Sequence, residues 1–247
     1  MIQLNLLWKG RIPLEKVEWE LDSEWEYKLS PDLETKRDDI WQTTMTDYPD
    51  SYDGSLLVLN DFSINSKSAF LKMGFIRFSR ILTLEKFKSA FHKYGCMGVQ
   101  SLIFSPKKTH ILLGQRSEEL MYCPLYYSGP GGMLETADAE NPFQDAIMRE
   151  VVEEVQVDFQ LERYLVTIAK DLYTKVGVCF LVECEVAEPF NLSASVEGNE
   201  EWSDNQLLWY PIEDVRNLEE SLFLESPVFV RDEWELYQTT GESVLWP

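Results

Sequence analysis

The 247-residue sequence lacks the features that mark several common classes of protein. Its four cysteines form no CxxC pair and its two histidines are too few for a zinc site at usable spacing. The apolar runs fall far short of the roughly 18 residues that cross a bilayer, and Met1–Asn5 has no basic residue of the kind that starts a signal peptide. Cations are scarce: 22 basic against 43 acidic residues give a formal net charge of −21, which argues against nucleic-acid binding. We therefore expect a soluble, cytoplasmic protein without nucleic-acid or membrane partners.

The composition is ample for a packed core, with 45% hydrophobic and 13% aromatic residues. The length corresponds to between one and two domains. Sheets interleaved with helices, without strict βα alternation, favour an α+β or mixed α/β fold. The sequence pattern changes near Gly95 to strand, turn, strand. This change predicts a small α+β accessory domain over 1–95 and a second domain over 96–247.

Residues 1–95 show strand and helix patterns but no catalytic motif. Two strand patterns flank a turn-prone Asn65–Lys67 segment. The second of two predicted helices has Thr83 as its N-cap and Gly95 as its stop. The predicted elements are strands at 2–7, 56–59 and 68–75 and helices at 36–48 and 84–94.

Residues after 96 begin with a predicted hairpin around the turn Pro106–Lys108. A helix follows over Pro142–Val155, with Asn141 as N-cap and Pro142 at the first position, where its missing N–H costs nothing. The remaining pattern predicts strands at 99–105, 110–115, 164–170, 176–186 and 206–210 and a helix at 226–237.

Three glutamates of the predicted helix carry the chemistry. Glu150, Glu153 and Glu154 are spaced i, i+3 and i+4, so their carboxylates converge on one stripe. A hard divalent cation, Mg²⁺ or Mn²⁺, offsets their repulsion and bridges to substrate phosphates. The alternative is the solvated face of an amphipathic helix. The preceding Gly131 and Gly132 favour the metal interpretation, because glycine lets the backbone approach a ligand closely.

The stretch from Gly131 onward resembles the box of the Nudix hydrolases, which reads Gly, five residues, Glu, seven residues, then Arg-Glu-U-x-Glu-Glu-x-Gly-U with U aliphatic. Residues 149–157 match every position of the second half except the Gly, which is Gln156. Leu112–Arg116 and Pro130–Glu135 fit the upstream pattern, and the resemblance covers about residues 96–215.

The loop of the box departs from the family pattern. Five residues separate Gly132 from position 138, where Asp138 stands rather than Glu, and ten residues rather than seven separate Asp138 from Arg149. Either Asp138 or Glu140 is therefore a candidate for the loop carboxylate that the family pairs with the box arginine.

The resemblance implies a mixed sheet sandwiched by helices and attack of a metal-activated water on a diphosphate linkage. It implies Mg²⁺ or Mn²⁺ as cofactor, with Arg149 orienting a glutamate. The implied metal ligands are Glu150, Glu153, Glu154 and the Gly131 carbonyl. The implied catalytic residues are Arg149, Glu153 and Glu154, with Glu200 or Glu201 on a late loop as base or ligand. The candidate substrate contacts are Arg116, Gly132 and Lys175.

The first domain shows a shorter resemblance. Ile40–Trp41 and Phe70–Phe75 resemble the N-terminal domain of a Nudix branch that cleaves UDP-glucose and UDP-galactose, although ordinary core residues would explain them equally. We therefore expect a pyrophosphohydrolase of a nucleoside diphosphate linked to another group, with a UDP-sugar ahead of ADP-ribose. The alternative is a nucleotide-binding or regulatory module without turnover. The aromatic content of 1–95 permits a homodimer.

Overall fold

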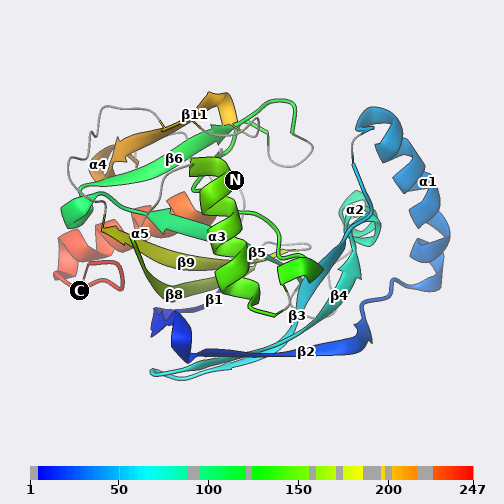
Figure 1. Ribbon diagram of the computed structural model, residues 1–247, viewed down its shortest axis with the longest axis horizontal. Coiled ribbons are helices and arrows are strands. Elements are labelled where there is room, and N and C mark those ends of the chain that lie inside the picture. The colour runs from blue at the N-terminus through cyan, green and yellow to red at the C-terminus, as the bar shows by residue number, and fades with distance from the viewer. Residues whose placement is uncertain are drawn as a thin grey trace.

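Figure 1 shows the computed structural model of the chain. The structure describes residues 5–49, 51–87, 95–120, 124–138, 140–155, 160–170, 175–185, 196–197, 202–215 and 225–246.

Two β-sheets form the frame of the molecule. The larger has seven strands, in the spatial order β1 (Asn5–Pro13), β8 (Gln160–Lys170), β9 (Lys175–Glu185), β5 (Gly95–Ile103), β3 (Ser55–Ile64), β4 (Ala69–Arg77) and β2 (Val17–Glu26). The smaller has the order β10 (Val196–Glu197), β11 (Trp202–Pro211), β6 (His110–Arg116) and β7 (Tyr127–Ser128). The pairs β5–β9 and β2–β4 are parallel and the others antiparallel, so the expected mixed fold is confirmed.

Helices cover both faces of the larger sheet. They are α1 (Pro31–Asp47), α2 (Phe78–Lys86), α3 (Pro142–Val155), α4 (Ile212–Val215) and α5 (Glu225–Thr240), with short 3₁₀ turns η1 (Leu14–Lys16), η2 (Pro106–Lys108) and η3 (Thr136–Asp138). Side chains of β5 alternate between faces. Met97 and Val99 pack in the cluster that contains α3, whereas Leu102 and Phe104 pack in the cluster of α4 and α5. No described helix is both long and apolar enough to span a membrane.

Strands from residues 1–95 enter the same sheet as the later strands. β1 pairs antiparallel with β8 at one edge, and β3 pairs with β5 through Val58↔Cys96 and Leu59↔Gly95. The N-terminal residues therefore flank the central strands β8, β9 and β5 on both sides (Figure 1). The division into units at 1–95 and 96–247 stays a prediction.

The predicted hairpin after residue 99 is wrong. β5 and β6 belong to different sheets, and their adjoining ends are joined by the isolated bridge Phe104↔Ile111 and by the bond from the Ser105 N–H to the His110 carbonyl at 3.0 Å. The turn between them holds Lys107 and Lys108 at φ values of 65° and 52°, so the chain turns a corner between the sheets. Apolar side chains of β6 belong to two hydrophobic clusters. Leu112 packs in the cluster that contains α3, and Ile111 packs in the cluster that contains α5.

The helix predicted over 84–94 begins earlier. α2 starts at Phe78, and Thr83 is not its N-cap but a buried residue within it, whose hydroxyl donates to the Ser79 carbonyl. The N-cap position is Arg77, whose side chain makes no capping bond, and Asp53 caps the helix from a distant segment by accepting from the Ser79 N–H at 2.8 Å. A cap from a segment so distant leaves no local sequence signal. Residues 88–94 lie outside the described part of the chain.

Candidate active site

The segment that follows β7 is inserted between two strands of the large sheet. We call residues 130–138 the glycine loop. β5 and β3 both bond to it, so the loop lies where these strands separate. The backbone bonds are Ser101 N–H to Pro130 O (2.7 Å), Val99 N–H to Gly132 O (2.9 Å), Leu134 N–H to Met97 O (3.0 Å) and Leu57 N–H to Leu134 O (2.8 Å).

Both glycines of the loop are required by close contacts. A Cβ on Gly131 would lie 2.2 Å from the Val99 carbonyl oxygen, so a side chain there would force the loop off the sheet. A Cβ on Gly132 would lie 2.3 Å from Oε1 of Glu150. The first glycine therefore lets the loop join the sheet, and the second leaves room for a carboxylate of α3.

Helix α3 separates the three predicted glutamates. Glu150 and Glu154 are 7% and 1% exposed, and Glu154 Oε2 accepts from the Gly131 N–H at 3.1 Å. Glu153 is exposed. At about 100° per residue, position 153 lies well round the helix from the line joining positions 150 and 154. The expected stripe of three carboxylates is thus a buried pair beside an exposed third.

Arg149 joins the helix to the glycine loop. Its Nη1 donates to Glu150 Oε1 at 2.5 Å, and its Nη2 donates to Asp138 Oδ2 at 3.1 Å and to the Met133 carbonyl at 3.5 Å. Asp138 is 3% exposed, whereas Glu140 is exposed. The loop carboxylate that pairs with Arg149 in this structure is therefore Asp138.

The electrostatics of this network keep Arg149 charged. Burial opposes its charged form, but attraction by Glu150, Asp138 and Glu135 outweighs burial and raises the pKa of Arg149 above its ordinary value. A permanent cation is therefore held between a loop carboxylate and a helix carboxylate.

The chemistry of the buried pair fits a divalent cation. Two carboxylates one turn apart in the interior need positive charge, and oxygen donors are what Mg²⁺ and Mn²⁺ prefer. Because Gly132 has no side chain, the Glu150 carboxylate can lie close to the loop backbone. Within the described residues no group of three or more His, Cys, Asp or Glu side chains is arranged to hold a metal. Mg²⁺ commonly uses only one or two carboxylates and completes its shell with water and phosphate.

The other predicted site residues are placed in part. Arg116 ends β6 opposite Trp202, and its carbonyl accepts from the Ser203 hydroxyl at 3.0 Å. Lys175 begins β9 beside Cys96, and its side chain lies outside the description. Glu200 and Glu201 also lie outside the described residues.

Sequence reasoning missed the contribution of the N-terminal residues. β3 bonds to the loop through Leu57, and Leu56 bridges to Glu135. These contacts join segments far apart in the chain, and no spacing rule relates them.

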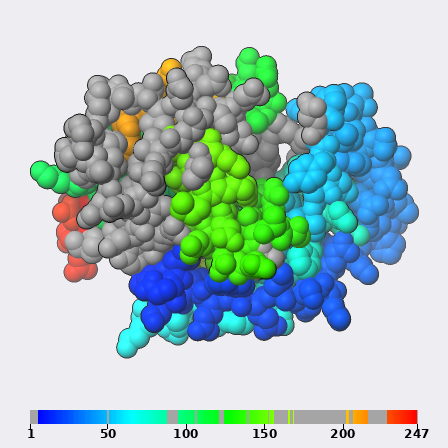
Figure 2. Space-filling model, viewed as in Figure 1, coloured from blue at the N-terminus to red at the C-terminus, as the bar shows by residue number. Residues whose placement is uncertain are grey.

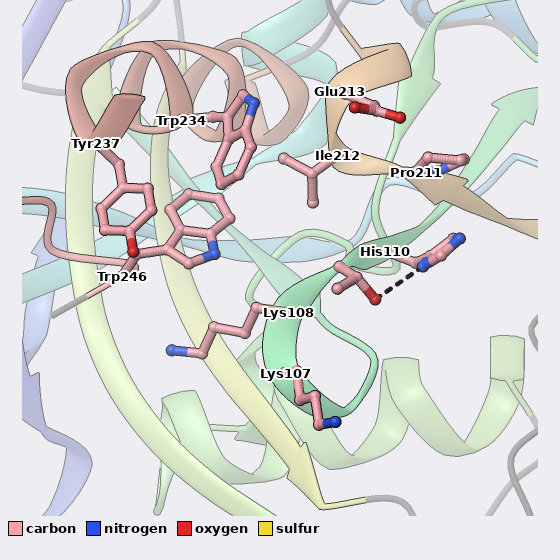
Figure 3. Close-up of a pocket in the computed structure, with 10 residues that line it drawn as sticks. Lys107, Lys108, His110, Pro211, Ile212, Glu213, Trp234, Tyr237 and Trp246 are labelled. Carbon is pink, nitrogen blue, oxygen red and sulfur yellow. Dashed lines mark hydrogen bonds between the residues drawn. The ribbon is translucent and has the colours of Figure 1, made fainter. Parts of the chain in front are cut away.

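A separate pocket of about 420 Å³ lies at the other end of β6 from Arg116. Figure 3 shows Trp234, Tyr237 and Trp246 facing the corner that carries Lys107 and Lys108. The Lys108 ammonium donates to the Leu245 carbonyl at 2.7 Å, and Trp246 packs edge-on against Phe104 at 5.6 Å. These contacts fasten the C-terminal residues to the β5–β6 corner, and the pocket contains none of the predicted site residues.

Comparison with known proteins identifies the region that contains this site. Residues 97–231 match the family model described as NUDIX domain. No curated protein sequence matches the chain significantly.

Solved structures with similar folds include a MutT protein from Methanosarcina mazei Go1, with 19% identity and a TM-score of 0.45 over 62% of this chain and 100% of that one. A C. elegans Ap4A hydrolase shares 18% identity, with a TM-score of 0.39 over 58% of this chain and 98% of its own. The NUDIX domain of Shewanella oneidensis NrtR, complexed with ADP ribose, shares 15% identity, with a TM-score of 0.37 over 62% and 96%.

Proposed function

The chain belongs to the Nudix family and is a hydrolase of phosphoanhydride bonds, a pyrophosphohydrolase of nucleoside diphosphate derivatives, and on this premise we propose a metal-dependent enzyme that prefers nucleotide sugars. The observation that carries the proposal is the buried pair Glu150 and Glu154, held against the glycine loop.

Glu150 and Glu154 are proposed to hold Mg²⁺ or Mn²⁺, with Glu153 and the Gly131 carbonyl as further ligands. When bound, the cation would lower the pKa of the attacking water and neutralise charge on the diphosphate. Arg149 holds Glu150 in place through its 2.5 Å bond and is itself fixed by Asp138. The chain's contribution is thus a preorganised set of oxygen donors, of which the Glu150 and Glu154 carboxylates are buried.

The proposed proton acceptor and substrate contacts lie around the buried pair and on the late loop. Glu153 is exposed and free to turn toward a substrate, and Glu200 or Glu201 is the proposed alternative base. Arg116, Gly132 and Lys175 are the proposed contacts to the diphosphate. The −21 net charge supports a cation in the site, because an acidic protein attracts an anionic substrate poorly without one.

A UDP-sugar is proposed ahead of ADP-ribose. The support is the likeness of Ile40–Trp41 and Phe70–Phe75 to the branch that cleaves UDP-glucose and UDP-galactose. The backbone bonds from β3 to the glycine loop agree with a role of the N-terminal residues at the site. A homodimer stays a prediction.

The test is hydrolysis by the purified chain with Mg²⁺ and with Mn²⁺. UDP-glucose, UDP-galactose, ADP-ribose, a dinucleoside polyphosphate and a nucleoside triphosphate are each assayed with a coupled phosphatase that releases phosphate from the products. We expect the highest kcat/KM with a UDP-sugar and loss of the signal in EDTA. Faster ADP-ribose hydrolysis would overturn the substrate assignment alone, whereas turnover that persists in EDTA would overturn the metal.

A further inference from the structure

Fixed walls surround the pocket shown in Figure 3. We call it the C-terminal pocket, and the residues that border it are 107–110, 211–213, 234, 237 and 246. The Glu233 carboxylate of α5, 2% exposed, accepts from the Ser243 hydroxyl at 2.8 Å and from the Val244 N–H at 3.0 Å. The Lys9 ammonium of β1 donates to the same carboxylate at 2.8 Å. These bonds tie the segment that carries Trp246 to α5, so the pocket is preformed, as small-molecule sites usually are.

Aromatic rings form one wall of the C-terminal pocket. The ring centroids of Trp234 and Trp246 are 5.1 Å apart, and Tyr237 stacks on Trp234 at 5.7 Å with an interplanar angle of 28°. The Ile212 side chain borders the same space from α4 (Figure 3). Such a wall favours a ligand with a flat aromatic group, because aromatic rings stack on indole faces.

The β5–β6 corner brings positive charge to the same pocket. Lys107 is exposed and makes no hydrogen bond or ion pair within the described part of the chain, so its long side chain can turn to a bound anion. The Lys108 ammonium lies near Leu245, to whose carbonyl it donates. Among the described residues that line the pocket, Glu213 is the one carboxylate. In a chain with a net charge of −21, this local excess of cations favours an anionic ligand.

The backbone of the corner is strained where it presents these cations. Lys107 has φ 65° and ψ 8°, and Lys108 has φ 52°. Both residues are thus in the left-handed region, which side chains rarely adopt and which glycine would adopt without cost. Strain of this kind is concentrated at ligand-binding sites, and here it sets two lysines side by side at the pocket.

We propose that the C-terminal pocket binds a nucleotide, with its base against Trp234 and Trp246 and its phosphate at Lys107 and Lys108. A nucleotide combines the two groups that the walls favour, a flat base and an anion. The volume of about 420 Å³ lies within the range of roughly 300–1,000 Å³ that is typical of small-molecule sites.

The proposed nucleotide site is separate from the glutamates of α3. β6 and β11 pair through Pro211↔His110 at the pocket and through Trp202↔Arg116 at their other end. Figure 2 shows the red surface of the C-terminal residues at one edge of the molecule, apart from the green surface of α3 and the glycine loop. The inference therefore goes beyond the proposed function and does not depend on it.

The test is calorimetric titration of the full chain with AMP, in EDTA so that no divalent cation supports binding at the active site. We expect one AMP to bind per chain. Adenosine and inorganic phosphate should each bind about fivefold or more weakly, because each lacks one of the two groups. Absence of saturable AMP binding would overturn the proposal, and so would adenosine or phosphate that binds as tightly as AMP.

Substitution of Trp234 tests the aromatic wall. Trp234→Ala should weaken AMP binding about tenfold or more, whereas Trp234→Phe keeps a ring and should stay within about threefold of the wild type. The melting temperature of each variant shows whether it is folded. Wild-type affinity in folded Trp234→Ala would overturn the proposal.

Substitution of Lys107 tests the cation without removing a packed side chain. Asparagine tolerates the left-handed conformation, so Lys107→Asn should keep the fold and weaken AMP binding about two- to fivefold, with a smaller loss at high salt. Lys67→Asn, at an exposed lysine of the β3–β4 turn, is the matched control and should bind AMP like the wild type. Equal losses in the two variants would mean that binding follows overall charge, and would overturn the proposal.

A variant of the active site separates this inference from the proposed function. Glu154→Gln should bind AMP in EDTA with wild-type affinity, and a loss as large as that of Trp234→Ala would place the nucleotide at the active site and overturn the proposal. A wild-type chain that hydrolyses no substrate would overturn the proposed function. Its AMP binding, if lost in Trp234→Ala, would still support the C-terminal pocket.

Discussion

Helices α1 and α3 both begin with proline and both carry many charges, yet they place those charges in opposite surroundings. The 17 residues of α1 include none that is buried, and its cation Arg37 pairs with Glu34 and Asp38 near the surface. In α3 the charged residues Glu150 and Glu154 are buried beside Phe143 and Ile147. A charge run alone therefore does not identify a site, and what distinguishes α3 is the loop packed over its carboxylates.

The largest difference between the two helices should be in packing. Phe143→Ala removes a side chain that is 1% exposed and packs edge-on against Trp19 at 6.2 Å, and we expect a loss of about 3–5 kcal/mol in the free energy of unfolding. Trp41→Ala in α1 removes a larger but only partly buried ring against Phe78 and should cost on the order of 1 kcal/mol. Urea denaturation measures both, and equal losses would contradict the contrast.

The next effect should be confined to activity. Glu154→Gln keeps the shape of the buried side chain but removes its charge, so kcat should fall by about 10²-fold or more while the melting temperature is retained. Asp145→Asn, an exposed change in the first turn of the same helix, is the matched control and should leave kcat unchanged. Unchanged turnover in Glu154→Gln would remove that residue from the mechanism.

The contrast also shows how far sequence reasoning could go. Asn141, Pro142 and the apolar spacing predict helix α3 with the bounds that the structure has. The loop is longer than the family spacing allows, so the sequence leaves Asp138 and Glu140 as equal candidates. The folded structure pairs Arg149 with Asp138. Contacts such as the backbone bond from Leu57 to Leu134 follow from the packing of distant segments, which local patterns do not encode.

A smaller effect concerns the cap that sequence reasoning misplaced. Asp53→Ala removes the acceptor for the Ser79 N–H and should cost about 1 kcal/mol of stability. Thr83→Ser, at the position first expected to cap the helix, retains a hydroxyl within α2 and should have a smaller effect on stability. Equal stability losses, measured by urea denaturation, would contradict the assignment of Asp53 as the cap.

The smallest effect should come from the surface charges of α1. Arg37 donates to Asp38 at 2.8 Å and to Glu34 at 3.1 Å, and its hydrogen bond to Asp38 raises the pKa of Arg37. Solvent screens such pairs, so Arg37→Met should change the free energy of unfolding by less than about 1 kcal/mol. The change should shrink further in 1 M NaCl, where the Debye length is about 3 Å. A larger loss that salt does not reduce would mean that α1 holds its charges as tightly as α3, and the distinction between the two helices would then fail.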